Sequence, residues 1–163
     1  MGRVAALAVR ATELALADAG LLGSAAVTDG STGVAYGSTS GSPPAMEIYA
    51  RQFLASTVKG IAATDYVQFM SHTCAANLAV FFGIRGRLIP TCSACTSGSQ
   101  GIGYACETIR AGRQAVMIAG GAEELHPIDA AVFDIMYATS TRNDAPTSIQ
   151  PCTMTRGGLP GKG

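Results

Sequence analysis

Short apolar runs that end in glycine or small polar residues most constrain how this 163-residue chain can fold. The run 114–124 (QAVMIAGGAEE) holds five consecutive apolar residues and is stopped by Gly120 and Gly121. The runs 32–41 (TGVAYGSTSG) and 86–94 (GRLIPTCSA) are of the same kind. Apolar residues fill these runs without alternating with polar ones, as in strands whose two faces are both covered. They therefore predict a buried, largely parallel sheet.

Segments with helical spacing separate the predicted strands. The predicted helices are residues 4–17, 43–57, 71–86, 96–112 and 127–138. Gly20 and Gly112 are plausible stops, Pro43 and Pro127 suit a first turn, and Ser71 is a candidate N-cap. Strands that alternate with helices of this length predict an α/β fold with a layered α-β-α arrangement.

Two of these helices have an apolar face that should point inward. In the second helix, we expect the inward residues to be Ile48, Phe53 and Leu54. In the helix 96–112, the expected inward face consists of Ile102, Ala105, Cys106 and Ile109.

Charge and composition exclude several classes of partner. Charged residues make up 13% of the chain, against about 25% in ordinary domains, and the formal net charge is zero. We therefore expect no nucleic-acid partner and no membrane partner. The first 20 residues carry four charges, which excludes a signal peptide or a spanning helix there. Five irregularly spaced cysteines without a secretory signal are typical of reduced thiols and predict a cytoplasmic location.

Cys92 and Cys95 form a Cys-x-x-Cys pair that permits several interpretations. Zinc commonly needs four ligands, and the chain offers no second pair at suitable spacing, so we expect no metal. We also expect no cofactor. A redox pair would start a helix after a strand, but here the two thiols need not face each other. Alternatively, Cys95 is a nucleophile at a helix N-terminus, where the unpaired N–H groups favour the thiolate. An inert, buried Cys95 is the fourth reading.

The segment 91–124 (TCSACTSGSQGIGYACETIRAGRQAVMIAGGAEE) resembles the active-site region of the β-ketoacyl–acyl carrier protein synthases, the condensing enzymes of fatty-acid biosynthesis. Further resemblances to this family are the stretches GVAYGSTSGS (33–42), MSHTCAANLAVFFGIRG (70–86) and FDIMYATSTRNDAPTS (133–148). The resemblance implies the N-terminal half of a thiolase-like fold without its first strand. It covers nearly the whole chain, with residues 1–149 as a partial ketoacyl synthase N-terminal domain and residues 150–163 as a divergent or truncated tail.

The family's chemistry would fall on Cys95, which aligns with the catalytic nucleophile, while Cys92 lies on the incoming strand. By resemblance, Cys95 accepts an acyl group from acyl carrier protein. A malonyl carrier protein then loses carbon dioxide, and its carbanion attacks the acyl group. The Cys95 backbone N–H would be one oxyanion-hole donor. The strand Gly86–Cys92 would pair with its equivalent in a homodimer. The residues do not indicate substrate-binding positions.

The chain also departs from the family pattern. Neither His72 nor His126 matches the two family histidines, which belong to the second half of the fold. We therefore expect the 163 residues alone not to catalyse condensation. The alternatives are a non-catalytic or split subunit that binds a carrier protein or a complementary chain, and a thiol redox or metal-binding module. The sequence does not distinguish a fatty-acid from a polyketide pathway.

Overall fold

The computed structural model describes residues 1–139 and divides them between two units. Residues 1–124 form the first unit, and residues 125–139 are the described part of the second. The predicted boundary at residue 149 and the tail 150–163 lie outside the described residues. Among the described helices, none is long and apolar enough to cross a membrane.

Three parallel strands form the sheet of the first unit, in the order β2-β1-β3. The strands are β1 (Thr32–Gly37), β2 (Leu88–Thr91) and β3 (Val116–Gly121). The register pairs Ala35 with Ile89 on one side and with Ala119 on the other. β1 is buried at every residue, as predicted, while β3 is mostly half-buried and β2 is a short edge strand.

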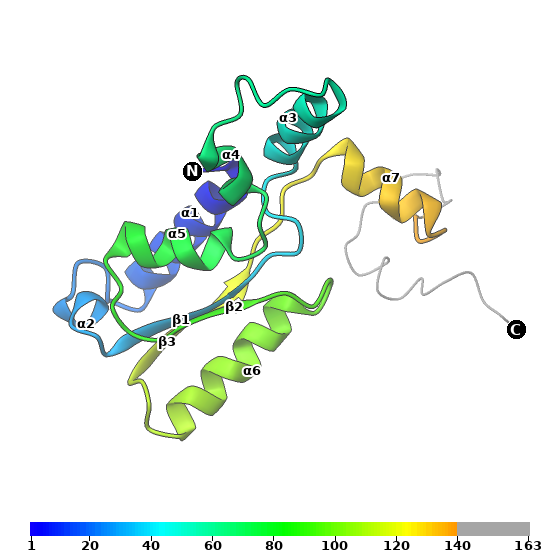
Figure 1. Ribbon diagram of the computed structural model, residues 1–163. Helices are drawn as coiled ribbons and strands as arrows, with labels where there is room; N and C mark the ends of the chain where they lie inside the picture. Colours follow the sequence, from blue (N-terminus) through cyan, green and yellow to red (C-terminus); the bar gives the residue numbers. More distant parts are fainter. Residues whose placement is uncertain (140–163) are drawn as a thin grey trace, which may run out of the picture. The chain divides into compact units, whose positions relative to one another are not determined.

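Helices cover the sheet on both faces, which confirms the predicted α-β-α layering. The helices of the first unit are α1 (Arg3–Asp18), α2 (Ala25–Thr28), α3 (Pro43–Leu54), α4 (Ala63–Gln68), α5 (Thr73–Phe82) and α6 (Ser97–Arg110). Helices α1 and α5 lie on one face and α6 on the other (Figure 1). The main core lies between α1, α5 and β1, where Val4, Ala8, Val34, Cys74 and Leu78 are buried.

Close contact between α6 and the sheet depends on glycine. A Cβ on Gly101 would lie 2.7 Å from the Ala35 carbonyl oxygen of β1. A Cβ on Gly37 would lie 2.7 Å from the Cβ of Ser97, in the first turn of α6. Real Cβ atoms do not approach other atoms this closely, so these positions need glycine for α6 to pack against β1.

The predicted inward face of α6 is wrong except for Ala105. Ile102, Cys106 and Ile109 are exposed, whereas Gly101, Ala105 and Thr108 are buried. Both sets have the same helical spacing, so periodicity alone does not distinguish them. The small residues face the sheet because they allow the helix to approach it.

Helices α3 and α5 end earlier than predicted: α3 ends at Leu54 and α5 at Phe82, against predicted ends at residues 57 and 86. Ser71 is not an N-cap, because α5 begins at Thr73 with His72 before it. Gly83 is the C-cap of α5, and α6 ends before the predicted stop Gly112; both glycines have a positive φ. The short helices α2 and α4 were not predicted. Ser24 caps α2 by accepting the Ala26 N–H at 3.3 Å.

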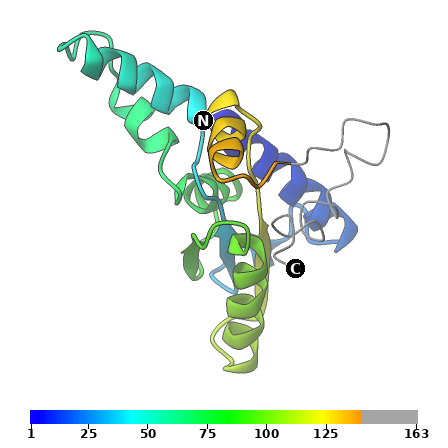
Figure 2. The same cartoon turned by 90° about the vertical axis from the view of Figure 1, so that its right-hand side faces the viewer.

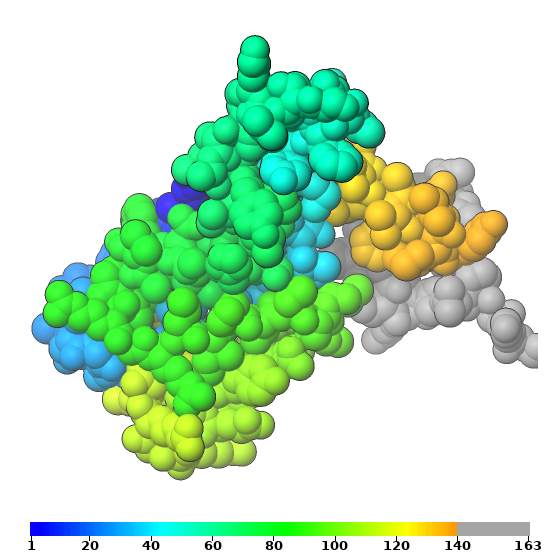
Figure 3. Space-filling view, viewed as in Figure 1, coloured from blue at the N-terminus to red at the C-terminus, as the bar shows by residue number. Residues whose placement is uncertain are grey.

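The segment containing α3 and α4 extends away from the strands of the first unit (Figure 2), and it projects at the top of the space-filling view (Figure 3). The rings of Tyr49, Tyr66 and Phe69 pack against one another and join the two helices. The expected inward orientation of Ile48, Phe53 and Leu54 is wrong, because Phe53 and Leu54 are 74% and 82% exposed and Ile48 is also exposed. In the chain as described, nothing covers this apolar face.

The second unit contains helix α7 (Pro127–Ile135) in its described part, where a helix was predicted. Pro127 occupies the first turn, as predicted. The N-cap His126 accepts the Ile128 N–H through Nδ1 at 3.3 Å.

Candidate active site

The candidate site lies at the C-terminal edge of the parallel sheet. Three segments leave the strands at this edge: Ser38–Gly41 after β1, Cys92–Thr96 after β2, and Ala122–Glu124 after β3. In open α/β sheets, ligands bind outside the carboxyl ends of the strands. The cysteine that the sequence singles out is therefore at the edge where chemistry is expected.

Cys95 is exposed and lies between the end of β2 and the start of α6. Thr96 is the N-cap residue of α6, so Cys95 immediately precedes the cap. The prediction of a strand–helix junction is confirmed, and the reading of a buried Cys95 is wrong. The strand itself ends at Thr91, one residue before the predicted Cys92.

A tight turn presents Cys95. Ala94 has a φ of 48°, in the left-handed region that non-glycine residues seldom adopt. Such a residue costs on the order of 1–3 kcal/mol and persists only where its surroundings hold it. The Thr96 and Ser97 N–H groups donate to the Ser93 and Ala94 carbonyl oxygens, each at 3.1 Å. These two bonds close the turn on either side of Cys95.

Ser97 and Thr91 fix this turn to the sheet. The Ser97 hydroxyl donates to the Ala94 carbonyl at 2.7 Å and accepts the Ser93 N–H at 2.9 Å. The Thr91 hydroxyl donates to the Ser97 carbonyl at 2.8 Å. Ser97 and Thr91 are both buried beside Gly37, so the turn is held by shielded hydrogen bonds.

A second polar cluster joins β1 and β3 at the same edge. The Glu123 carboxylate accepts the Thr39 N–H, and the Ser38 hydroxyl lies 3.4 Å from it. Next to it, buried Glu124 accepts the Ser42 hydroxyl at 2.9 Å. These contacts hold the loop that follows β1 against the end of β3.

The other thiols have different environments. All four cysteines of residues 1–139 are free, and Cys92 and Cys106 are exposed like Cys95. Cys74 is fully buried, and its burial raises the pKa of the thiol to about 11. The Ser38 side chain opposes this shift, and the Glu123 charge adds to it. Cys95 is thus distinguished from the other exposed thiols by its turn and helix cap.

The described residues hold no group of three or more His, Cys, Asp or Glu side chains that could bind a metal ion. His72 is exposed immediately before α5, and His126 belongs to the second unit, where its Nδ1 accepts a backbone N–H.

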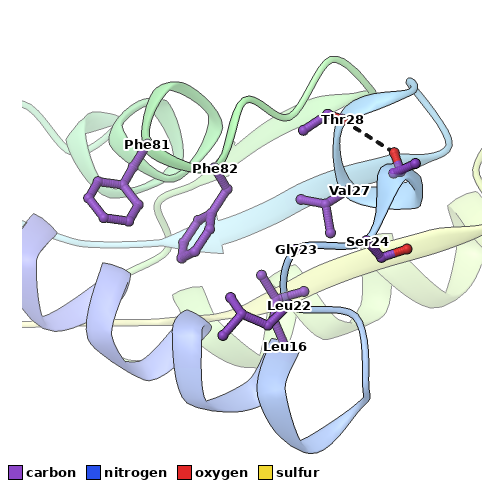
Figure 4. A pocket seen from close by; sticks show the side chains of 9 residues that line it. Leu16, Leu22, Gly23, Ser24, Val27, Thr28, Phe81 and Phe82 are labelled. Carbon is purple, nitrogen blue, oxygen red and sulfur yellow. Dashed lines mark hydrogen bonds between the residues drawn. The ribbon is translucent and has the colours of Figure 1, made fainter.

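A pocket of about 390 Å³ lies elsewhere, among α1, α2 and α5. Leu16, Leu22, Val27 and Phe82 point into it (Figure 4). Its hydroxyl groups are engaged locally: Ser24 caps α2, and Thr28 donates to the Ala25 carbonyl at 3.3 Å. The pocket has no cysteine or histidine in its lining, so we do not assign the chemistry to it.

Sequence reasoning missed the residues that shape the site, chiefly Thr91, Ser97, Ser38 and Glu123. Thr91 and Glu123 follow apolar runs, and polar residues at the ends of parallel strands meet at one edge of the sheet. That signal could have placed them at the site. Their hydrogen-bond partners depend on the order of the strands, which the local sequence does not contain.

Comparison with known proteins identifies a family and several relatives with similar sequences. Residues 1–158 match the family model described as "Beta-ketoacyl synthase, N-terminal domain". The 3-oxoacyl-[acyl-carrier-protein] synthase 1 of Haemophilus influenzae is 36% identical over 90% of this chain and 36% of its own length. The granaticin polyketide putative beta-ketoacyl synthase 1 of Streptomyces violaceoruber is 31% identical, over 98% of this chain and 39% of its own length.

A solved beta-ketoacyl synthase from Burkholderia phymatum superposes with a TM-score of 0.84 and 53% identity. The match covers 90% of this chain and 36% of that structure. It confirms the predicted thiolase-like fold. The chain spans little more than a third of the length of these relatives. On the family match and the similarity along nearly its whole length, the chain belongs to the beta-ketoacyl synthase family, in the N-terminal domain of that family.

Proposed function

We propose that Cys95 is the acyl-accepting nucleophile of a condensing enzyme that acts on acyl carrier protein thioesters. In the first half-reaction, the Cys95 sulfur attacks the thioester carbonyl. A new carbon–sulfur bond forms, the bond to the carrier thiol breaks, and the Cys95 proton ends on the departing thiol. The backbone N–H of Cys95 would donate to the oxyanion.

In the second half-reaction, malonyl carrier protein loses carbon dioxide, and the resulting carbanion attacks the acyl-Cys95 carbonyl. The carbon–carbon bond forms as Cys95 leaves as thiolate. Both fatty-acid and polyketide synthases are among the relatives, and the 36% identity to the Haemophilus enzyme supports fatty-acid biosynthesis. Four free thiols in the described part of the chain suit a cytoplasmic location.

The observation that carries the proposal is the placement of Cys95. An exposed thiol in a strained turn, directly before a helix N-terminus and at the C-terminal edge of a parallel sheet, is positioned to meet a substrate. Cys92 and Cys106 are exposed but do not have this combination of features. Neither His72 nor His126 matches a catalytic histidine of the family, so we assign to this chain the acyl-transfer half of the chemistry.

Acylation mapping tests the assignment. The chain is incubated with acyl carrier protein bearing a short acyl thioester, digested, and analysed by mass spectrometry. We expect the acyl mass on the peptide containing Cys95, its loss in Cys95→Ala, and its retention in Cys106→Ala. Acylation of Cys106 in preference to Cys95, or none at all, would refute the proposed nucleophile.

A second candidate function is a non-catalytic or split subunit that binds a carrier protein or a complementary chain. The exposed apolar residues Phe53, Leu54 and Val58 favour it, because a face of this kind is usually covered by a partner. Binding of acyl carrier protein without acyl transfer would support this role.

We also propose a homodimer formed through β2. This strand is at the edge of the sheet and ends four residues before Cys95, so pairing there would place two candidate sites near one interface. Exposed Leu88 supports the availability of this edge.

A further inference from the structure

We propose that Glu123 is a positioning residue for Cys95 and acts through Thr39 and Cys92. This inference rests on the proposed function of Cys95 as an acyl acceptor. It assigns a specific task to a carboxylate that does not itself touch Cys95.

On one side, Glu123 holds the loop after β1. Its carboxylate accepts the Thr39 N–H, and the Ser38 hydroxyl lies 3.4 Å away. Ser38 in turn accepts the Gly41 N–H at 3.1 Å. A backbone N–H that donates to a carboxylate makes a charge-assisted bond, which is stronger than a neutral one. The loop Ser38–Gly41 is therefore fixed to the end of β3.

On the other side, Thr39 contacts the segment that leads from β2 to Cys95. The Cys92 thiol lies 3.9 Å from the Thr39 carbonyl oxygen, within range for a weak sulfur hydrogen bond. The next residue, Ser93, begins the turn and donates its N–H to Ser97. The backbone of Thr39 is thus held by β3 through its N–H and by Cys92 through its carbonyl.

The consequence is a continuous connection from the end of β3, across the loop of β1, to the turn of Cys95. Without the carboxylate, Thr39 has no partner at its N–H, and Cys92 loses a fixed acceptor. The turn depends on external support because Ala94 is in a left-handed conformation. Displacement of a reacting atom by about 1 Å can reduce a rate by about 100-fold.

The test compares Glu123→Ala with Glu123→Gln, which retains an acceptor oxygen for Thr39. Glu107→Ala is the matched control, since it removes an exposed carboxylate from α6. Two quantities are measured in the 163-residue chain: the rate of Cys95 acylation by an acyl carrier protein thioester, and amide hydrogen exchange of the peptide 91–97. Circular dichroism checks that each variant is folded.

We expect Glu123→Ala to slow acylation by about tenfold or more. We also expect faster exchange within residues 93–97. Glu123→Gln should stay within about threefold of the parent, because it retains the hydrogen bond without the charge. Glu107→Ala should match the parent in both measurements. If Glu123 only stabilised its own neighbourhood, exchange would rise in residues 38–41 and remain unchanged in residues 93–97. That result would overturn the inference.

Failure of the inference and failure of the proposed function give different results. If the parent is not acylated at Cys95, the proposed function fails, and exchange in residues 93–97 still tests the connection. If Glu123→Ala does not fold, Cys92→Ala interrupts the same connection at its other end, and Cys92→Ser restores a donor. Equal acylation and equal exchange in Cys92→Ala and the parent would also overturn the inference.

Discussion

Cys74 and Cys95 are two thiols whose surroundings give them different chemistry. Cys74 is fully buried between α5 and the sheet, whereas Cys95 is exposed ahead of α6. Burial raises the pKa of Cys74 from 9.0 to about 11, because the thiolate is poorly solvated in the core. Cys74 therefore stays protonated and inaccessible at neutral pH, which leaves Cys95 free of competition from the core.

The raised pKa of Cys74 predicts a loss of stability at alkaline pH. Unfolding exposes a thiol that ionises near pH 9, whereas the folded thiol ionises near 11. Stability is therefore fully present below about pH 9 and falls as the pH rises towards 11. We expect the free energy of unfolding to be about 1 kcal/mol lower at about pH 10 than at about pH 8. Urea unfolding at the two pH values measures this difference.

Cys74→Ala and Cys106→Ala form the control pair for this measurement. Cys74→Ala should reduce the pH dependence of the free energy of unfolding. Cys106→Ala should leave that dependence unchanged, because Cys106 is exposed. Burial also raises the pKa of Tyr36 above its ordinary value of 10.0, so part of the decline near and above pH 10 should remain in both variants. An unchanged dependence in Cys74→Ala would contradict the role of this thiol.

At the scale of the element, α6 joins the candidate site to the sheet. Its buried face consists of Ser97, Gly101, Ala105 and Thr108. These small residues bring the helix close to β1 and place its N-terminus beside Gly37. The position of the Cys95 turn therefore depends on the packing of the whole helix.

Substitution by alanine should have opposite effects on stability at two glycines of α6, Gly101 and Gly103. A Cβ at Gly101 would lie 2.7 Å from the Ala35 carbonyl oxygen, whereas a Cβ at Gly103 meets no atom within 4 Å. We expect Gly101→Ala to destabilise the fold by about 2 kcal/mol through overpacking. Gly103→Ala should stabilise it by about 1 kcal/mol, since alanine restricts the unfolded chain and favours helix. Thermal or urea unfolding of both variants measures the effects.

The same two variants, Gly101→Ala and Gly103→Ala, test whether the packing of α6 on the sheet positions Cys95. Cys95 acylation should fall in Gly101→Ala and remain at the parent level in Gly103→Ala. Equal stability of the two variants would show that α6 does not pack against β1 as described.

The sequence predicts most elements because each is encoded locally. The run ending at Gly120 and Gly121 is a strand, Gly83 and Gly112 follow helix ends, and Cys95 falls at a strand–helix junction. The orientation of α6 could not be predicted, because Ile102 and Gly101 belong to adjacent faces with identical spacing. Whether the large or the small residues face the sheet is decided by how closely the backbones must approach, which is a tertiary property.

At the scale of the whole molecule, the open edge of β2 has a specific hydrogen-bonding pattern. The Val34 N–H donates to the Arg87 carbonyl at 2.7 Å, and the Ser38 N–H donates to the Thr91 carbonyl at 3.3 Å. In a parallel ladder, the backbone N–H and C=O groups of alternate residues point to the same neighbouring strand. Those of residues 87, 89 and 91 point to β1, so the backbone groups of Leu88 and Pro90 point to the open edge. Proline has no N–H, which leaves Leu88 as the outward donor within β2.

This pattern predicts how a homodimer through β2 would form and how it would be disrupted. In a two-fold arrangement the same surface meets itself, so antiparallel pairing centred on Leu88 lets each Leu88 N–H donate to the partner strand. Leu88→Lys would then place two like charges opposite each other. We expect the parent to sediment as a dimer and Leu88→Lys to dissociate at least about tenfold more readily. Val80→Lys, at an 83% exposed position on α5, is the matched control and should remain dimeric. A monomeric parent, or equal dissociation of the two lysine variants, would exclude pairing at this edge.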